Sequence, residues 1–136
     1  MSFENKMVAI INKEVDIGVA MNAVAHASIA MGGRVGTDAL QIAQYKDASD
    51  NLWPISAIPY IILRGKSSEI RKAITQAKEQ NVQQITFLET MTGGGYIEQM
   101  DRTALLPEEP LVYFAAVLFG PWDAVSQITK KLSLYK

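Results

Sequence analysis

The chain of 136 residues contains no cysteine and only one histidine. Without cysteine there is no disulfide framework, no thiolate nucleophile and no cysteine-ligated metal site. One histidine is also too few for a His-rich zinc site, so we expect no metal and no cofactor. Proton transfer near neutral pH would then fall to His26, because imidazole is the side chain that exchanges a proton in that range.

Long apolar runs and excess charge of either sign are also missing. No apolar run approaches the ~18 residues of a membrane span, and the first residues lack the basic start and cleavage pattern of a signal peptide. The net charge is −1, which argues against broad binding to nucleic acid, because such binding needs several phosphate-neutralising Lys and Arg side chains. We therefore expect a soluble, cytoplasmic protein that does not contact membranes.

Apolar runs alternate with helical patterns, which predicts a single α/β domain over residues 1–136. Unbroken apolar runs are typical of strands that are buried on both faces. We expect four strands in one sheet, at residues 7–12, 59–64, 85–88 and 111–119. The last run is the most hydrophobic, so it should lie inside the sheet rather than at its edge.

Helices are predicted between and after these strands. Ile70, Ala73, Ile74 and Ala77 recur at helical spacing, with Ser67 or Ser68 as the N-cap residue. Residues 96–103 predict a short amphipathic helix, and a further helix follows Pro121. Residues 40–45 allow a helical turn, but the turn-forming cluster 47–51 and the following residues 52–54 favour a hairpin or an extended excursion instead.

The first helix, within residues 15–31, carries the most informative pattern. Asn22 and His26 lie one turn apart on one face, with Gly18 one turn before them. Nearly all other side chains of the helix are apolar, so we expect neighbours to cover it on most sides, Asp16 to cap it, and residues 32–33 to end it. Asn22 and His26 then either line a water-filled cleft or are satisfied by neighbouring backbone groups in a packed core.

Residues after two of the strands add polar groups to this candidate site. Lys13 follows the first strand, and Glu89 and Thr92 follow the third, just before the glycines 93–95. The glycines match neither phosphate-binding pattern, GxxxxGK[ST] or GxGxxG. A flexible loop over the site is therefore the better interpretation of this run.

Two segments carry a resemblance to a known family. KMVAIINKEVDIGVAMNAVAHASIAMG near the start and VYFAAVLFGPWDAVSQITKKLSLYK near the end resemble the first and last segments of type II peptidyl-tRNA hydrolases. The chain is still more similar to an uncharacterised domain family that shares the hydrolase fold. The resemblance implies a mixed four-stranded sheet with helices on both faces.

The residues of the hydrolase site match only in part. Gly18 and His26 correspond to the glycine and histidine of the hydrolase helix, whereas the lysine position is Val19 and the glutamine position is Ala23. The Asp-Ala-Gly-x-Thr stretch of the hydrolases is replaced by residues 89–92. Loss of a cation that positions phosphate or polarises an ester carbonyl argues against peptidyl-tRNA hydrolysis and against tight transfer RNA binding.

Two functions remain open. The first is a small-ligand-binding or hydrolase-like cleft, in which His26 carries a proton, Glu89 orients it or acts as a base, and Asn22 donates to a substrate oxygen. Its remaining ligand-binding candidates are Lys13, Gly18 and Thr92. The second is a non-catalytic domain that acts by self-association, as a homodimer, or by binding a protein partner. Aromatic anchors for such contacts are available at Trp53, Tyr60, Phe114, Phe119, Trp122 and Tyr135.

Overall fold

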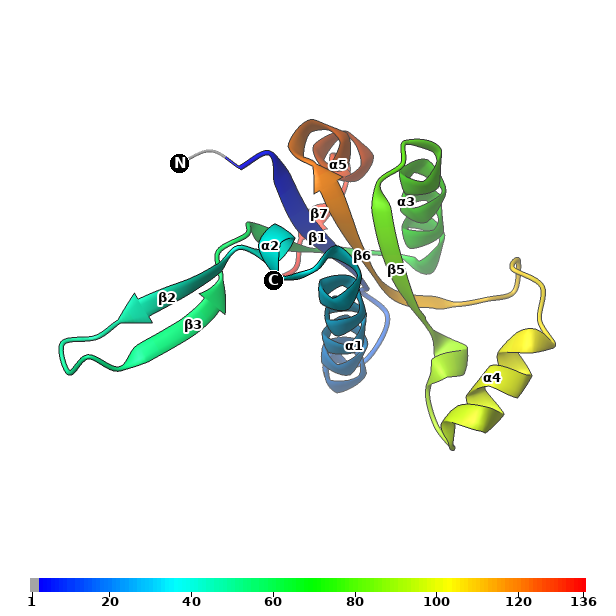
Figure 1. The fold of residues 1–136 in the computed structure, drawn as a ribbon. Coiled ribbons are helices and arrows are strands. Elements are labelled where there is room, and N and C mark those ends of the chain that lie inside the picture. Colours follow the sequence, from blue (N-terminus) through cyan, green and yellow to red (C-terminus); the bar gives the residue numbers. More distant parts are fainter. Residues whose placement is uncertain (1–2) are drawn as a thin grey trace.

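A computed structural model describes residues 3–136 and shows a mixed five-stranded sheet, a separate two-stranded hairpin and helices on both faces of the larger sheet (Figure 1). The strand order in the larger sheet is β5-β6-β1-β4-β7. The strands are β1 (Asn5–Asn12), β2 (Ile42–Lys46), β3 (Leu52–Ser56), β4 (Tyr60–Gly65), β5 (Gln83–Leu88), β6 (Tyr113–Pro121) and β7 (Ser133–Leu134). The helices are α1 (Ile17–Val35), α2 (Thr37–Leu40), α3 (Ser67–Glu79), the 3-10 helix η1 (Glu89–Met91), α4 (Tyr96–Ala104) and α5 (Trp122–Thr129).

The central strand is β1, which runs parallel to β4 and antiparallel to β6. Its residue Ala9 lies opposite Ile62 on one side and Val117 on the other. All four predicted strands are present, and β6 lies inside the sheet as its hydrophobicity predicted. The prediction of four strands is nevertheless wrong, because β7 adds a fifth at the edge. With two residues, β7 is too short to give a periodic pattern, and it forms only by pairing with β4.

The two faces of the sheet are covered by different helices. Val8 and Ile10 of β1 point to the side covered by α3 and α5, whereas Met7 and Ala9 point to the side covered by α1. This alternation follows from the two-residue period of a strand. The predicted stripe of α3 is confirmed, since Ile70, Ala73, Ile74 and Ala77 are all buried.

Helix α1 is less covered than its composition predicted. Only Ala20, Ala23, Ala27 and Met31 are buried. Met21 is 61% exposed and Ile29 74% exposed, so the expectation that neighbours cover most sides is wrong. The sheet packs against one side of α1, and nothing in residues 3–136 packs on its outer side.

The ends of α1 and α3 also differ from the sequence-based expectation. Helix α1 continues through both glycines to Val35 and ends at Gly36, whose φ of 85° suits glycine. Asp16 precedes the helix but makes no capping hydrogen bond with its side chain. Ser67 lies inside α3, where its hydroxyl accepts a hydrogen bond from the Tyr113 amide at 3.0 Å.

The expected hairpin is confirmed within residues 37–56, whereas a helical turn at residues 40–45 is wrong because residues 42–46 form β2. The single helical turn α2 is followed closely by β2. The chain reverses at the predicted turn at residues 47–51, and β3 pairs with β2. The hairpin strands pair only with each other, and the hairpin projects away from the larger sheet (Figure 1).

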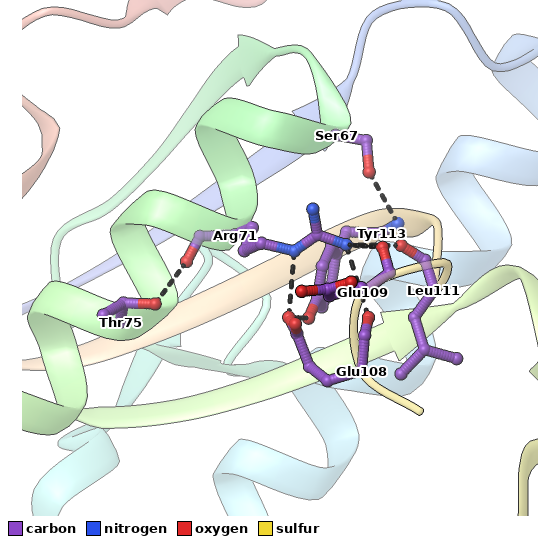
Figure 2. A network of polar contacts seen from close by, with 7 residues as sticks. All are labelled: Ser67, Arg71, Thr75, Glu108, Glu109, Leu111 and Tyr113. Atoms are coloured by element: carbon purple, nitrogen blue, oxygen red, sulfur yellow. Dashed lines mark hydrogen bonds and ion pairs between the residues drawn. The ribbon is translucent and has the colours of Figure 1, made fainter. Parts of the chain in front are cut away.

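The segment that leads from α4 into β6 is fixed to α3 by Arg71 (Figure 2). The guanidinium of Arg71 donates to the Glu108 carboxylate at 2.9 Å and to the carbonyls of Glu109 and Leu111 at 2.7 and 2.9 Å. It also lies 5.1 Å from the ring centroid of Tyr113, whose hydroxyl donates to Glu108. The hydrogen bonds from Tyr113 and then Arg71 lower the pKa of Glu108, so the carboxylate stays charged and the segment stays attached.

Candidate functional site

An open cleft of about 1060 Å³ lies between α1 on one side and η1, the glycine loop and α4 on the other. Strand β5 forms its floor. The lining residues of α1 are Gly18, Val19, Asn22, His26, Ala27 and Ala30. The floor and opposite wall are formed by Ile85, Thr86, Phe87, Met91, Thr92, Gly93, Tyr96, Gln99, Met100, Thr103 and Ala104.

Asn22 and His26 are the polar groups that α1 presents to the cleft. Both side chains are exposed, and neither makes a side-chain hydrogen bond within residues 3–136. The imidazole lies over the floor, with its centroid 6.0 Å from that of the Phe87 ring and the planes inclined by 33°. Two adjacent side chains with free donors and acceptors therefore face a largely apolar cavity.

Within residues 3–136, no Asp, Glu, Lys or Arg side chain lines this cleft. The polar groups of the opposite wall are largely engaged within the protein. Thr92 donates to the Glu89 carbonyl at 2.6 Å. The Thr103 hydroxyl donates to the Gln99 carbonyl, so it accepts in its hydrogen bond with the Thr90 hydroxyl. The hydroxyl of Tyr96 makes no side-chain hydrogen bond within residues 3–136, so the free polar groups of the cleft are those of Asn22 and His26 on α1 and of Tyr96 on α4.

Arg102 fixes the shape of the opposite wall. Its guanidinium donates to the carbonyl of Thr90 at 2.9 Å and to those of Thr92 and Gly93, which ties η1 and the glycine loop to α4. Gly93 and Gly94 both have φ of 70°, a left-handed conformation that glycine adopts without strain. The carbonyls of this loop face Arg102, so the loop is an anchored wall rather than an amide cradle for an anion.

A second cavity of about 620 Å³ adjoins the cleft at the end of the sheet where β1 finishes and β6 begins. Val19 and Thr92 line both cavities. The acidic residues of the second cavity are Glu14, Asp16 and Glu89.

Asn12 is a buried polar residue of this second cavity. Its Nδ2 donates to the Tyr113 carbonyl at 2.9 Å and its Oδ1 accepts from the Glu14 amide at 2.9 Å. Asn12 therefore joins the end of β1 to the start of β6 and shapes the turn before α1.

The structure distributes the predicted site residues over several places. Gly18, Asn22, His26 and Thr92 line the cleft, Glu89 lines the second cavity, and Lys13 lines neither. The cleft residues of α4 were not among the predicted site residues; they are Tyr96, Gln99, Met100, Thr103 and Ala104. Their spacing of three and four residues on an amphipathic helix was the available signal. Nothing in the sequence distinguished Arg102 from an ordinary surface arginine.

Across residues 3–136, no three His, Asp or Glu side chains lie close enough together to hold a metal ion. In the same range, no helix has both the length and the hydropathy of a bilayer span.

The comparisons with known proteins place the chain in a family. Residues 5–136 match the model of a family described as "Protein of unknown function (DUF2000)". The chain belongs to this family. No curated protein matches it.

A solved structure shows the same fold. The DUF2000 chain is similar to a protein of unknown function from Agrobacterium tumefaciens strain C58, with a TM-score of 0.84 and 18% sequence identity. The similarity covers 99% of this chain and 100% of the other. At this level of identity the comparison shows the shared fold alone.

Proposed function

We propose that this DUF2000 protein binds a small, uncharged and largely apolar molecule in the cleft between α1 and α4. One observation supports this above all: Asn22 and His26 present unpaired hydrogen-bonding groups to a cavity whose other surfaces are mostly apolar. Small-molecule sites commonly combine apolar walls with a few convergent polar groups in this way. The absence of charged lining residues favours a neutral ligand, since a buried charge without a partner is costly.

Each proposed contact has a distinct task. Asn22 would donate its amide to a ligand oxygen, and His26 would accept or donate a hydrogen bond one turn away. Gly18 would let the ligand approach the helix backbone. No protein atom lies within 4 Å of the position that a Cβ would occupy there, so the space beside the backbone is open to a ligand. Thr92 lies on the opposite wall, and Lys13 could contact only ligand atoms that extend beyond the cleft.

Binding is a better-supported activity than hydrolysis for this site. A hydrolase-like reaction would use His26 as the proton carrier and Glu89 as its orienter or as a base. Among residues 3–136 no hydrogen bond links these two side chains, and they line different cavities. Catalysis would therefore require a substrate that spans the junction at Val19 and Thr92.

We propose that the fold is related to that of type II peptidyl-tRNA hydrolases without sharing their activity. Val19, at the position of the hydrolase lysine, places an uncharged side chain where the two cavities join. The nearby carboxylates Glu14, Asp16 and Glu89 would repel phosphate. Titration with transfer RNA at physiological salt should thus give no sub-micromolar binding, and tight binding that weakens steeply with added salt would support the hydrolase function.

The proposed ligand class can be tested with the neutral fluorophore N-phenyl-1-naphthylamine. It should bind with increased emission and shift the ring NMR signals of His26, which are unambiguous because the chain has one histidine. Ala30→Leu places a bulkier side chain beside His26 in the cleft and should weaken binding at least tenfold, as should His26→Ala. Met21→Ala is the matched control, because Met21 is exposed on the same helix and does not line the cleft.

The outcomes separate the cleft from other apolar surfaces. Loss of binding in the Ala30→Leu variant with retention in Met21→Ala supports the cleft. Binding that responds to Met21→Ala but not to Ala30→Leu would place the fluorophore on the outer side of α1 and contradict the proposal. Absence of any His26 shift in the wild-type complex would contradict it as well.

A further inference from the structure

The projecting hairpin carries an exposed, uncharged face. Tyr45 lies opposite Trp53, and Ala43 lies opposite Ile55, so these four side chains share one face of the two-stranded sheet. Tyr45 is 63% exposed and Trp53 60% exposed. Aromatic residues that are exposed in this way are typical anchors of protein interfaces.

The turn holds this face in a defined arrangement. The Asp47 carboxylate accepts hydrogen bonds from the Trp53 indole at 3.0 Å, from the Asn51 side chain at 3.1 Å and from the amides of Ser49 and Asn51. The indole is therefore fixed before any partner binds, which reduces the entropy lost on association.

The strand edges are poorly suited to association. The amide of Asp47 donates to the Asn51 carbonyl, and the amide of Ala57 donates to the Gln41 carbonyl. Hydrogen-bonded and non-hydrogen-bonded pairs alternate along an antiparallel ladder, so Pro54 and its partner Gln44 form a non-hydrogen-bonded pair. The backbone nitrogen of Pro54 therefore points away from β2. That nitrogen has no hydrogen to donate, so the outer edge of β3 is blocked. In the larger sheet, Arg34 donates to the Gln84 carbonyl of edge strand β5 at 3.0 Å. Association through the edges of β3 and β5 is therefore disfavoured, and the exposed aromatic face of the hairpin is the surface that we consider.

A second uncharged surface lies on the outer side of α1. Ile17, Met21, Ala25 and Ile29 follow one another at four-residue intervals and are all exposed. No charged residue occurs between Asp16 and Arg34, so this surface runs almost the full length of the helix without a charge. It is distinct from the cleft, which these four residues do not line.

The area available decides between two ways of covering the hairpin. Two hairpins stacked face to face would bury four partly exposed rings, on the order of 500 Å². Stable interfaces bury about 1,200 Å² or more, so this contact alone is too small. If the hairpin face of each copy packs on the outer side of α1 of the other copy, the two copies together bury two hairpin faces and two α1 surfaces. Face-to-face stacking would bury only the two hairpin faces. One chain supplies both surfaces, whereas a partner that covers only one would leave the other exposed.

We propose that the protein forms a two-fold symmetric dimer in which the hairpin face of each copy packs on the outer side of α1 of the other. Every contact then occurs twice, as two-fold symmetry requires. The cleft stays open in this arrangement, so the dimer and the ligand site can be tested separately.

Sedimentation of the wild-type chain and its variants tests the association. The wild type should sediment as a dimer at about 100 μM, and Tyr45→Lys or Ile29→Lys should weaken dimerisation at least a hundredfold. Leu105→Lys is the control, because Leu105 is 83% exposed but belongs to neither surface, and it should remain dimeric. Circular dichroism checks that each variant is folded. A monomeric wild type, or folded Tyr45→Lys and Ile29→Lys variants that remain dimers, would overturn the proposal.

Cross-linking tests the arrangement itself. Since the chain contains no cysteine, Ala43→Cys and Ala25→Cys each introduce a single thiol, the first on the hairpin and the second on α1. When equal amounts of the two proteins are mixed and oxidised, mixed disulfides should clearly exceed the two homodisulfides taken together, because random pairing would make these amounts equal. Predominant pairing of Cys-substituted hairpins with each other would instead show face-to-face stacking and refute the proposed arrangement.

Discussion

The carboxylate of Asp47 accepts a hydrogen bond from the indole nitrogen of Trp53 at 3.0 Å. This contact joins the turn of the hairpin to its largest exposed ring. The bond from Trp53, followed by those from Asn51, lowers the pKa of Asp47 below its ordinary value. The orientation of Trp53 is thus linked to the charge of a carboxylate.

Acidification should release Trp53 from the turn. Because the folded-state pKa of Asp47 is lowered, its stabilising effect is complete above the unfolded-state value of about 3.9 and disappears as the pH falls through the folded-state value. In a Trp122→Phe background, Trp53 emission should stay constant from neutral pH to about 4 and change below it. Asp47→Ala should show the released emission at neutral pH. Far-ultraviolet circular dichroism must show that the sheet persists where the change occurs.

Asn12→Ala should destabilise the fold by about 1–3 kcal/mol, because it leaves the buried Tyr113 carbonyl and the Glu14 amide without their partner. Urea unfolding of the variant measures this loss. Lys13→Ala provides the control, since its exposed side chain makes no hydrogen bond within residues 3–136, and its effect should stay within about 0.5 kcal/mol. Equal stability of Asn12→Ala and wild type would show that the bonds across β1 and β6 contribute nothing.

Ala23→Leu should destabilise the protein by about 1–3 kcal/mol, because Ala23 is fully buried against Phe87 and Ala115 and a larger side chain would push α1 from the sheet. Ala30→Leu makes the same chemical change on the same helix, where the side chain enters the open cleft. Its effect on stability should stay within about 0.5 kcal/mol. Urea unfolding of the two variants measures both changes in the free energy of unfolding. Equal changes would contradict the close packing of α1 on the sheet at Ala23.

Arg71→Lys should loosen the segment that precedes β6 while leaving the fold intact. Lysine keeps the charge but cannot donate in the forked geometry that reaches Glu108, Glu109 and Leu111 together (Figure 2). Amide hydrogen exchange should accelerate at Leu111 and Tyr113. Exchange in β1 serves as the internal control and should be unchanged.

Much of the fold could be predicted from local patterns. The apolar runs of β1 and β6 and the helical spacing of Ile70, Ala73, Ile74 and Ala77 reflect burial within single elements, so they are visible in the sequence. The exposure of Met21 and Ile29 was not visible. Composition shows that a helix is apolar but does not show whether a neighbour exists to cover it.

The candidate site could be predicted only on the side formed by α1. Gly18, Asn22 and His26 share a face because their spacing alone determines it. The opposite wall depends on how α4 is held against η1, and that arrangement depends on the contacts of Arg102 with three carbonyls. A backbone carbonyl carries no sequence signature, so these partners could not be inferred.

The pairing of β1 with β6 has a consequence for how the protein is made. Met7 lies opposite Phe119, so the central ladder joins segments separated by nearly the whole chain. During synthesis, β1 and the buried side of α1 must wait for residues 113–121 before they can be covered. Such non-local pairing slows folding and leaves apolar surface exposed to aggregation. The apolar side of β1 and α1 that faces β6 therefore stays uncovered until the last fifth of the chain has been made.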